Sequence, residues 1–303
     1  MQSGIIEKIE KLKKEKNAVI MAHYYAPREV QEIADYVGDS YYLARLAVST
    51  DKDIVVLCGV KFMGESVKIL NPNKKVLMPN ISADCPMAHM ADVGKIAKMR
   101  EEYDDLAVAC YINSTAELKS VSDVCVTSSN AVKIVERLEN RNIYFIPDKN
   151  LGTYVKERVS GKNIILNDGC CPIHASVTAG DVEKIRREHP EAKLLCHPEC
   201  IDEVVKMSDF VGSTAEIIDF AKASADKEFI ISTEDGVGYA LMSSSPGKSF
   251  VFVKQDFECA DMKMNTLDAV LSVLENEENE ILLDEELMAG ANRALVRMLE
   301  LAK

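Results

Sequence analysis

Basic residues are scarce in this chain relative to acidic ones. Its 303 residues include 36 lysines and arginines against 49 aspartates and glutamates, which gives a formal net charge of −13 at pH 7. Because nucleic-acid binding requires a basic face, this balance argues against a nucleic-acid partner. It does not exclude a small anionic substrate, since a single pocket can be positive within an acidic surface.

Several kinds of segment are also missing. No apolar run is long enough to span a membrane, and the N-terminal residues predict an amphipathic helix rather than a signal peptide. The chain has neither a G-x-G-x-x-G nor a P-loop pattern, which argues against a bound nucleotide. Nine cysteines without a secretory signal predict a cytoplasmic protein, whose thiols stay reduced and serve metal binding, catalysis or core packing.

What the chain does contain is a faint threefold internal repeat. The segment from Asp35 to Ser40 recurs at 123–128 and at 209–214. Four further positions recur in the three copies: His23, Tyr111 and His197; Tyr25, Asn113 and Glu199; Gly64, Gly152 and Gly238; and Cys85, Cys171 and Cys259. The first three sets are spaced by 88 and then 86 residues, and the cysteines by 86 and then 88. Repeated units that each bury one face tend to pack in related orientations. The repeat therefore predicts three similar units about a pseudo-threefold axis.

Within each copy, short apolar segments alternate with helical ones. The clearest apolar runs are 18–22, 54–58, 106–110, 143–146, 193–196 and 229–232. This pattern is typical of α/β folds with parallel sheets covered on both faces, so we predict three α/β/α three-layer domains. Their predicted bounds are 1–90, 91–176 and 177–282, with a C-terminal helix at 283–303 that packs on the first domain or near the N-terminal helix. Gly64 is expected to begin a helix.

The repeated polar positions all follow predicted strands. Ligands of open parallel sheets bind at the carboxyl ends of the strands. If the three sheet edges face one another, these positions therefore meet in one central site.

The three repeated cysteines are the first candidates for chemistry. Cys85 and Cys171 are each followed by proline, which ends a strand and begins an exposed loop. Three converging thiols would hold a metal or a cluster, and a [4Fe–4S] cluster held by three cysteines keeps one iron without a protein ligand. A structural zinc site would need a fourth ligand, for which His174 is the candidate. The alternative is that all three thiols are simply buried apolar groups.

The remaining cysteines carry weaker signals. Cys170 stands beside Cys171 and could replace it as a ligand. The segment Cys196-His-Pro-Glu-Cys200 has a spacing that could serve zinc, but Cys196 aligns with strand residues of the other copies, which favours a core position. The same core interpretation applies to Cys58, Cys110 and Cys125.

Histidines and their neighbours are the candidates for proton transfer. His23 and His197 hold the same repeat position, and His174 follows a candidate metal ligand. Histidine exchanges protons or pairs with substrate carboxylates near neutral pH. Tyr25 and Glu199, two residues after the repeated histidines, are candidates for acid–base chemistry.

Hydroxyl residues stand where a strand turns into a helix in each copy. They are Ser40, Ser128, Ser213 and Thr214. Such a hydroxyl commonly caps the helix. Several helix N-termini that meet at one centre would instead bind phosphate or carboxylate groups.

Taken together, these motifs resemble the quinolinate synthase family along nearly the whole chain. The segments that carry the resemblance are His23-Tyr-Tyr25, Gly38-Asp-Ser40, Cys85-Pro-Met, Tyr111-Ile-Asn-Ser-Thr, Thr127-Ser-Ser-Asn130, Cys171-Pro-Ile-His174, His197-Pro-Glu199-Cys, Gly212-Ser-Thr214 and Met262-Lys-Met-Asn265-Thr. The resemblance implies three α/β domains about a pseudo-threefold axis. It also implies a [4Fe–4S] cluster held by Cys85, Cys171 and Cys259.

The reaction that the resemblance implies is a step of NAD biosynthesis. Iminoaspartate and dihydroxyacetone phosphate condense to quinolinate with loss of phosphate and water, and the open iron assists dehydration. An oxidase or dehydrogenase that produces iminoaspartate is an expected partner. Tyr25, His174 and Glu199 are expected to transfer protons, whereas the expected substrate-binding residues are His23, Ser40, Tyr111, Asn113, Ser128, His197, Ser213 and Thr214.

Two rival functions remain at this stage. One is a different iron–sulfur hydro-lyase that uses the same open iron. The other is a zinc-stapled protein that senses a small dicarboxylate.

Overall fold

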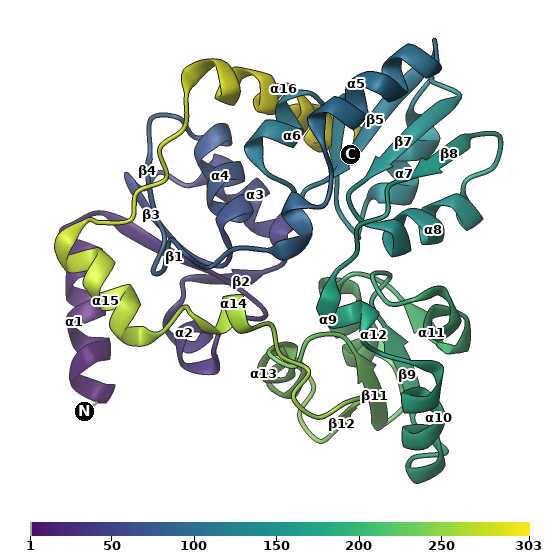
Figure 1. Cartoon of the computed structure of the whole chain (residues 1–303). Coiled ribbons are helices and arrows are strands. Elements are labelled where there is room, and N and C mark those ends of the chain that lie inside the picture. Colours follow the sequence, from purple (N-terminus) through teal and green to yellow (C-terminus); the bar gives the residue numbers. More distant parts are fainter. Residues whose placement is uncertain (1) are drawn as a thin grey trace.

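The computed structural model describes residues 2–303 and consists of three α/β units grouped around a common centre (Figure 1). Each unit contains one four-stranded parallel sheet, and the sheets have the same strand order: β2-β1-β3-β4, β6-β5-β7-β8 and β10-β9-β11-β12. The strands are β1 Ala18–His23, β2 Tyr36–Gly38, β3 Ile54–Cys58, β4 Lys75–Leu77, β5 Leu106–Tyr111, β6 Val124–Val126, β7 Asn142–Ile146, β8 Asn163–Leu166, β9 Lys193–Cys196, β10 Phe210–Val211, β11 Glu228–Ser232 and β12 Ser249–Phe252. The predicted fold class is confirmed.

Helices cover both faces of the sheets. Those of the first unit are α1 Gln2–Glu15, α2 Arg28–Ile33, α3 Ser40–Ser49 and α4 Lys61–Leu70, followed by the 3-10 helix η1 Pro86–His89. The second unit contains α5 Val93–Glu102, α6 Ala116–Ser120, α7 Ala131–Arg137, α8 Lys149–Arg158 and α9 Pro172–Ala175. The rest are α10 Ala179–Glu188, α11 Asp202–Met207, α12 Thr214–Ala223, α13 Val237–Ser244, α14 Ala260–Lys263, α15 Leu267–Asn276 and α16 Glu285–Leu301. Among the residues described, no helix is both long and apolar enough to cross a membrane.

The first strand of each unit divides its side chains between two cores. In β1, Val19 and Met21 join a large cluster shared by all three units, whereas Ile20 belongs to a smaller cluster on the outer face of the first sheet. The same alternation separates Ala107 from Val108 in β5. Because successive side chains of a strand point to opposite faces, apolar residues at every position give this three-layer arrangement. The shared inner core ties the three sheets together.

A repeated aspartate gives the internal repeat a structural counterpart. The carboxylate of Asp35 accepts the backbone N–H of Ile20 in β1 at 2.9 Å. Asp123 accepts the N–H of Val108 at 2.7 Å, and Asp209 that of Leu194 at 2.8 Å. In each unit, a basic side chain from the helix that precedes the first strand also forms an ion pair with the aspartate. These side chains are Lys13, Arg100 and Arg186. The same contacts therefore fasten the first strand to the second in all three units.

The repeated glycines lie inside helices and do not begin them. Gly64 is within α4, which begins at Lys61, so the expectation that Gly64 begins a helix is wrong. A Cβ atom at Gly64 would lie 2.8 Å from the sulfur of Met78, and one at Gly152 would lie 2.7 Å from Leu166. Glycine is present because the helix approaches the end of the fourth strand too closely for a side chain.

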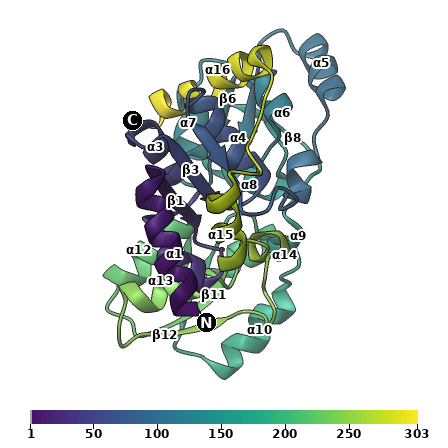
Figure 2. The same cartoon turned by 90° about the vertical axis from the view of Figure 1, so that its left-hand side faces the viewer.

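The last two helices return to the beginning of the molecule. Figure 2 shows α15 beside α1, and apolar residues of α15 complete the outer core of the first sheet. The domain boundary predicted at residue 282 assigns α15 to the third domain, whereas α15 packs on the first unit. Helix α16 packs mainly on α6 and β6 of the second unit and also on α4 of the first, so the expected packing on the first unit describes only part of its contacts. The bounds at 90 and 176 remain a proposal.

Candidate active site

The carboxyl ends of the three sheets open onto one central cavity. Its lining includes the predicted residues His23, Tyr25, Ser40, Cys85, Tyr111, Asn113, Ser128, Cys171, His174, His197, Glu199, Thr214 and Cys259. Ser213 is the exception among the predicted set. Its side chain is fully buried and caps α12 in a capping box with Glu216, so we do not assign it to substrate binding.

The three repeated cysteines occupy equivalent places on the wall of this cavity. Cys85, Cys171 and Cys259 each stand immediately before a single-turn helix, namely η1, α9 and α14. Backbone N–H groups of these helices donate hydrogen bonds to the sulfurs, for example from Met87 to Cys85 and from Met262 to Cys259. Amide hydrogen bonds of this kind favour thiolate sulfur and tune iron–sulfur clusters.

Burial favours the neutral form of these thiols. It raises the pKa of Cys85 to about 12, and it raises the pKa of Cys171 well above its ordinary value, with Glu199 adding to the effect in both cases. The pKa of Cys259 is also raised, mainly by burial. A bound metal would supply the positive charge that deprotonates the thiols.

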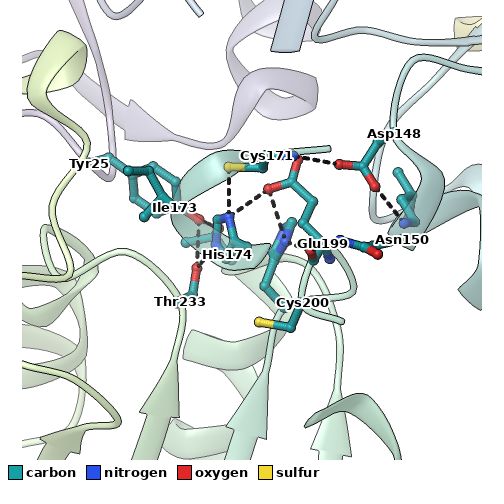
Figure 3. Close-up of polar contacts among 12 residues, drawn as sticks. Tyr25, Asp148, Asn150, Cys171, Ile173, His174, Glu199, Cys200 and Thr233 are labelled. Atoms are coloured by element: carbon teal, nitrogen blue, oxygen red, sulfur yellow. Dashed lines mark hydrogen bonds and ion pairs between the residues drawn. The ribbon is translucent and has the colours of Figure 1, made fainter. Parts of the chain in front are cut away.

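His174 lies at the centre of the polar network drawn in Figure 3. Its Nδ1 atom is 2.8 Å from Oε2 of Glu199 and 3.2 Å from the sulfur of Cys171. Its other ring nitrogen is 2.9 Å from the hydroxyl of Thr233. The imidazole therefore connects a cavity carboxylate to a thiol and a hydroxyl, and such a group can receive and pass on a proton.

Glu199 is ionised although it is buried. Burial opposes its charge, but the neighbouring His174, His197 and Tyr111 outweigh burial and lower the pKa of the Glu199 carboxyl to about 2. Its Oε1 atom has no hydrogen-bond partner among the described residues. A buried carboxylate oxygen without a partner is costly, and one that lines a cavity can bind a proton or a hydroxyl of a ligand.

The hydroxyl of Tyr25 links residues of the first and third units. It lies 2.7 Å from the hydroxyl of Thr214 and 2.7 Å from that of Thr233. Since Thr233 also contacts His174, a chain of hydrogen-bonding groups runs from Tyr25 to Glu199. Burial raises the pKa of Tyr25 well above 10, so its hydroxyl keeps its proton at neutral pH.

His23 and His197 share one hydrogen-bonding arrangement. The backbone N–H two residues later donates to Nδ1 in each case, from Tyr25 at 3.1 Å and from Glu199 at 3.3 Å. Burial lowers the pKa of both histidines to about 3, so both are neutral. The hydrogen of each ring is then on Nε2, where it can donate to an oxygen of a ligand.

Two hydroxyls on the wall lie at the starts of longer helices. Ser40 is the first residue of α3, and Thr214 is the first residue of α12. Backbone N–H groups at a helix start have no partner within the helix and attract anions. The starts of α3 and α12 on the cavity wall are therefore suited to binding carboxylate or phosphate groups.

The sequence argument missed three polar residues at the site. Glu234 lines the cavity, Thr233 contacts both Tyr25 and His174, and the buried Asp148 contacts the backbone of Cys171. Asp148 and Glu234 occupy the same repeat position, but the first copy has Val60 there. A search of the repeat by position rather than by residue type would have found them.

The donor set fits a three-cysteine cluster better than a zinc site. Three thiols at equivalent positions match the number and type of ligand that a cluster with one open iron needs. Cys171, His174 and Glu199 form a second candidate group, whose ligand atoms lie within 4.8 Å of one another. His174 and Glu199 already pair with each other, however, and the second group makes no use of Cys85 and Cys259.

Comparison with known proteins identifies the family. The family described as "Quinolinate synthetase A protein" (NadA) matches residues 7–300. The quinolinate synthase of Caldicellulosiruptor saccharolyticus is 50% identical over 298 residues, which cover 98% of both chains. That of Fusobacterium nucleatum is 49% identical over 296 residues, covering 98% of this chain and 99% of the other. That of Clostridioides difficile is 46% identical over 303 residues and the full length of both.

The chain belongs to the quinolinate synthase family. Its relatives are enzymes of NAD biosynthesis, and this chain is likewise an enzyme. The rival interpretation as a protein that only senses a dicarboxylate is therefore wrong. In this member of the quinolinate synthase family, the match extends over all three units and includes every residue of the cavity named above.

Proposed function

We propose that this chain condenses iminoaspartate with dihydroxyacetone phosphate to form quinolinate, with release of phosphate and water. The observation that carries the proposal is one cavity that holds three equivalent thiols together with the buried His174–Glu199 pair. Family membership supports the product, and the chemistry of the lining supports the substrates. Both substrates are small anions, which suits a cavity that the ends of α3 and α12 and two neutral histidines line.

We propose that Cys85, Cys171 and Cys259 hold a [4Fe–4S] cluster in this cavity. When bound, the cluster would supply an iron without a protein ligand, which acts as a Lewis acid in dehydration. Cys170 is next to Cys171, but its backbone N–H contacts the sulfur of Met90, and it does not line the cavity.

The polar residues bind and orient the substrates in this proposal. His23 and His197 donate from Nε2 to carboxylate oxygens. Ser40 and Thr214 at the helix starts, together with Ser128 from the turn before α7, bind the phosphate and the remaining carboxylate. Tyr111 and Asn113 also line the cavity and contact the substrates in this proposal. The Oδ1 atom of Asn113 is buried without a partner among the described residues, so it can accept a hydrogen bond from a substrate N–H or O–H group.

Proton transfer belongs to Tyr25, His174 and Glu199. The Glu199 carboxylate takes a proton from a substrate carbon or hydroxyl that lies beside it, because its Oε1 has no hydrogen-bond partner among the described residues. His174 holds the other carboxylate oxygen and shares the proton. Tyr25 donates from the opposite end of the hydrogen-bonded chain, through Thr233. Because these hydrogen-bonded side chains are buried, water is excluded from the unstable imine.

The first experiment measures iron and acid-labile sulfide after anaerobic reconstitution. Wild type should bind about four irons, and Cys85→Ala, Cys171→Ala and Cys259→Ala should each lose the cluster. Cys170→Ala, the matched control, should keep it. Quinolinate formation from iminoaspartate and dihydroxyacetone phosphate is then assayed on the loaded protein. Zinc without iron in the wild type, or a cluster untouched by the three substitutions, would refute the proposed ligand set.

The instability of iminoaspartate implies a partner activity. We propose that an oxidase or dehydrogenase acting on aspartate supplies this substrate. A coupled assay with such an enzyme should give more quinolinate than the addition of preformed iminoaspartate at the same total concentration.

A further inference from the structure

The three cysteine-bearing loops are fastened to the sheets by one repeated backbone contact. In each unit, an N–H near the start of the helix after the third strand donates to a carbonyl two residues before the cysteine. The bonds run from Lys61 to Ala83 (2.9 Å), from Lys149 to Gly169 (2.7 Å) and from Asp235 to Phe257 (3.0 Å). The residue immediately before each N–H donor differs among the units and is Val60, Asp148 or Glu234.

In the second unit, this residue holds the backbone of the cysteine itself. Oδ2 of Asp148 accepts the N–H of Cys171 at 3.1 Å (Figure 3). Its Oδ1 accepts the N–H of Leu151 at 2.7 Å. The side chain is completely buried. Asp148 thus joins the first turn of α8 to the loop that carries the thiol.

The third unit repeats this contact with a longer side chain. Oε1 of Glu234 accepts the N–H of Cys259 at 3.0 Å, and Oε2 accepts the N–H of Gly236 at 2.8 Å. The ammonium of Lys263 lies 2.7 Å from Oε1 and so neutralises the buried charge. Glu234 is as completely buried as Asp148.

The first unit has no equivalent brace, because Val60 offers no acceptor. The N–H of Cys85 bonds instead to Asp84, its neighbour on the same loop, at 2.8 Å. The N–H of Asp84 in turn donates to Asp261 of α14 at 3.2 Å. Besides the backbone bond from Lys61, the Cys85 loop is therefore held by a side chain of the third unit and not by a side chain at the start of its own helix.

We infer that Asp148 and Glu234 are positioning residues that fix Cys171 and Cys259 for binding of the cluster. The inference rests on the proposed function, since it presumes that these thiols are ligands. Groups that orient metal ligands through hydrogen bonds typically change metal affinity tenfold to a hundredfold when they are lost. Each carboxylate accepts with both oxygens, whereas an amide has a single oxygen and presents an NH₂ group to the second backbone N–H. Asp148→Asn and Glu234→Gln therefore remove one contact and keep the shape of the side chain.

The test compares iron release from the reconstituted holoprotein. Wild type, Asp148→Asn, Glu234→Gln and the control Asp284→Asn are loaded anaerobically, and iron loss to an excess of a ferrous chelator is followed by absorbance. Asp284 also accepts two backbone N–H groups at a helix start, that of α16, but it lies outside the cavity. The electron paramagnetic resonance spectrum of the reduced cluster and the melting temperature of each apoprotein are recorded on the same samples.

Asp148→Asn and Glu234→Gln should each release iron about ten to a hundred times faster than wild type, with an altered spectrum, while Asp284→Asn behaves as wild type. If either of the first two variants melts too low to be loaded, the other still decides the question. Release and spectra equal to wild type in a loaded variant would overturn the inference and leave the proposed function standing. A wild type that takes up no iron would instead overturn the proposed ligand set, and this inference with it.

Discussion

Nδ1 of His174 lies 2.8 Å from Oε2 of Glu199, and both side chains are almost completely buried. An ion pair or hydrogen bond with this degree of burial does little for stability by itself, since desolvation of the two groups offsets their attraction. Its position on the cavity wall, beside the thiol of Cys171, is the basis of the proton-transfer role proposed above.

Replacement of either member of this pair should therefore reduce turnover. We expect His174→Gln and Glu199→Gln to lower kcat by roughly a hundredfold to ten-thousandfold, the usual contribution of general acid–base catalysis. The chain offers a matched control in His189 and Glu228, which lie on the surface with the same 2.8 Å separation. His189→Gln should keep wild-type kcat. Steady-state kinetics on protein with equal iron content checks this, and a wild-type kcat in both cavity variants would remove the pair from the mechanism.

Tyr25→Phe should separate catalysis from stability. The substitution deletes a hydroxyl that lies between those of Thr214 and Thr233. Tyr144→Phe is its control, because Tyr144 is buried with one hydrogen bond to Asn167 outside the cavity. Loss of a buried hydrogen bond costs about 1 kcal/mol in either case. Only Tyr25→Phe should also slow quinolinate formation, and equal rates for the two variants would argue against a role for Tyr25.

The repeat made much of this fold predictable, because repeated positions fix topology as well as sequence. Pairing of Ile20 with Val56 in the first sheet recurs as Val108 with Tyr144 and as Leu194 with Ile230, so one register serves all three sheets. The position of the cysteines after the fourth strands followed from the same alignment. Residues whose type is constant across the copies were therefore placed well.

A repeated position that lacks a polar residue in one copy gave no such signal. One repeat position is occupied by Val60, Asp148 and Glu234, which differ in side-chain type. No sequence motif therefore marked the two carboxylates that accept the backbone N–H groups of cysteines. Ser213 had the right type and spacing, but local capping of α12 uses its hydroxyl. The predicted packing of the C-terminal helix on the first unit describes only part of the contacts of α16, and the packing of α15 on the first unit was not predicted, because an apolar helix face does not indicate which unit it covers.

Gly152→Ala should destabilise the second unit. Its new Cβ would lie 2.7 Å from Leu166 and 3.0 Å from Phe145, closer than packed carbon atoms approach. Overpacking of this kind costs about 1–3 kcal/mol. Gly4→Ala is the control, because its Cβ would meet no atom within 4 Å, and alanine should stabilise α1 by up to about 1 kcal/mol. Urea unfolding of the two variants should move in opposite directions, and an unchanged midpoint for Gly152→Ala would contradict the close contact.

Glu277 should make stability depend on acid pH. It accepts from Lys16 at 2.7 Å and from Lys75 at 2.5 Å, and these hydrogen bonds lower the pKa of its carboxyl from 4.5 to about 2. Because the pKa is lower in the folded chain, the stabilisation is fully present above pH 4.5 and is lost as the pH falls toward 2. Glu277→Gln should therefore lower the melting temperature at pH 7 by about 1–3 °C, and the difference should disappear near pH 2. Glu275 lies in α15, which ends just before Glu277, and has no ion pair among the described residues; Glu275→Gln should leave the melting temperature unchanged at pH 7 and near pH 2. A pH-independent difference for Glu277→Gln would show that its charge is not the cause.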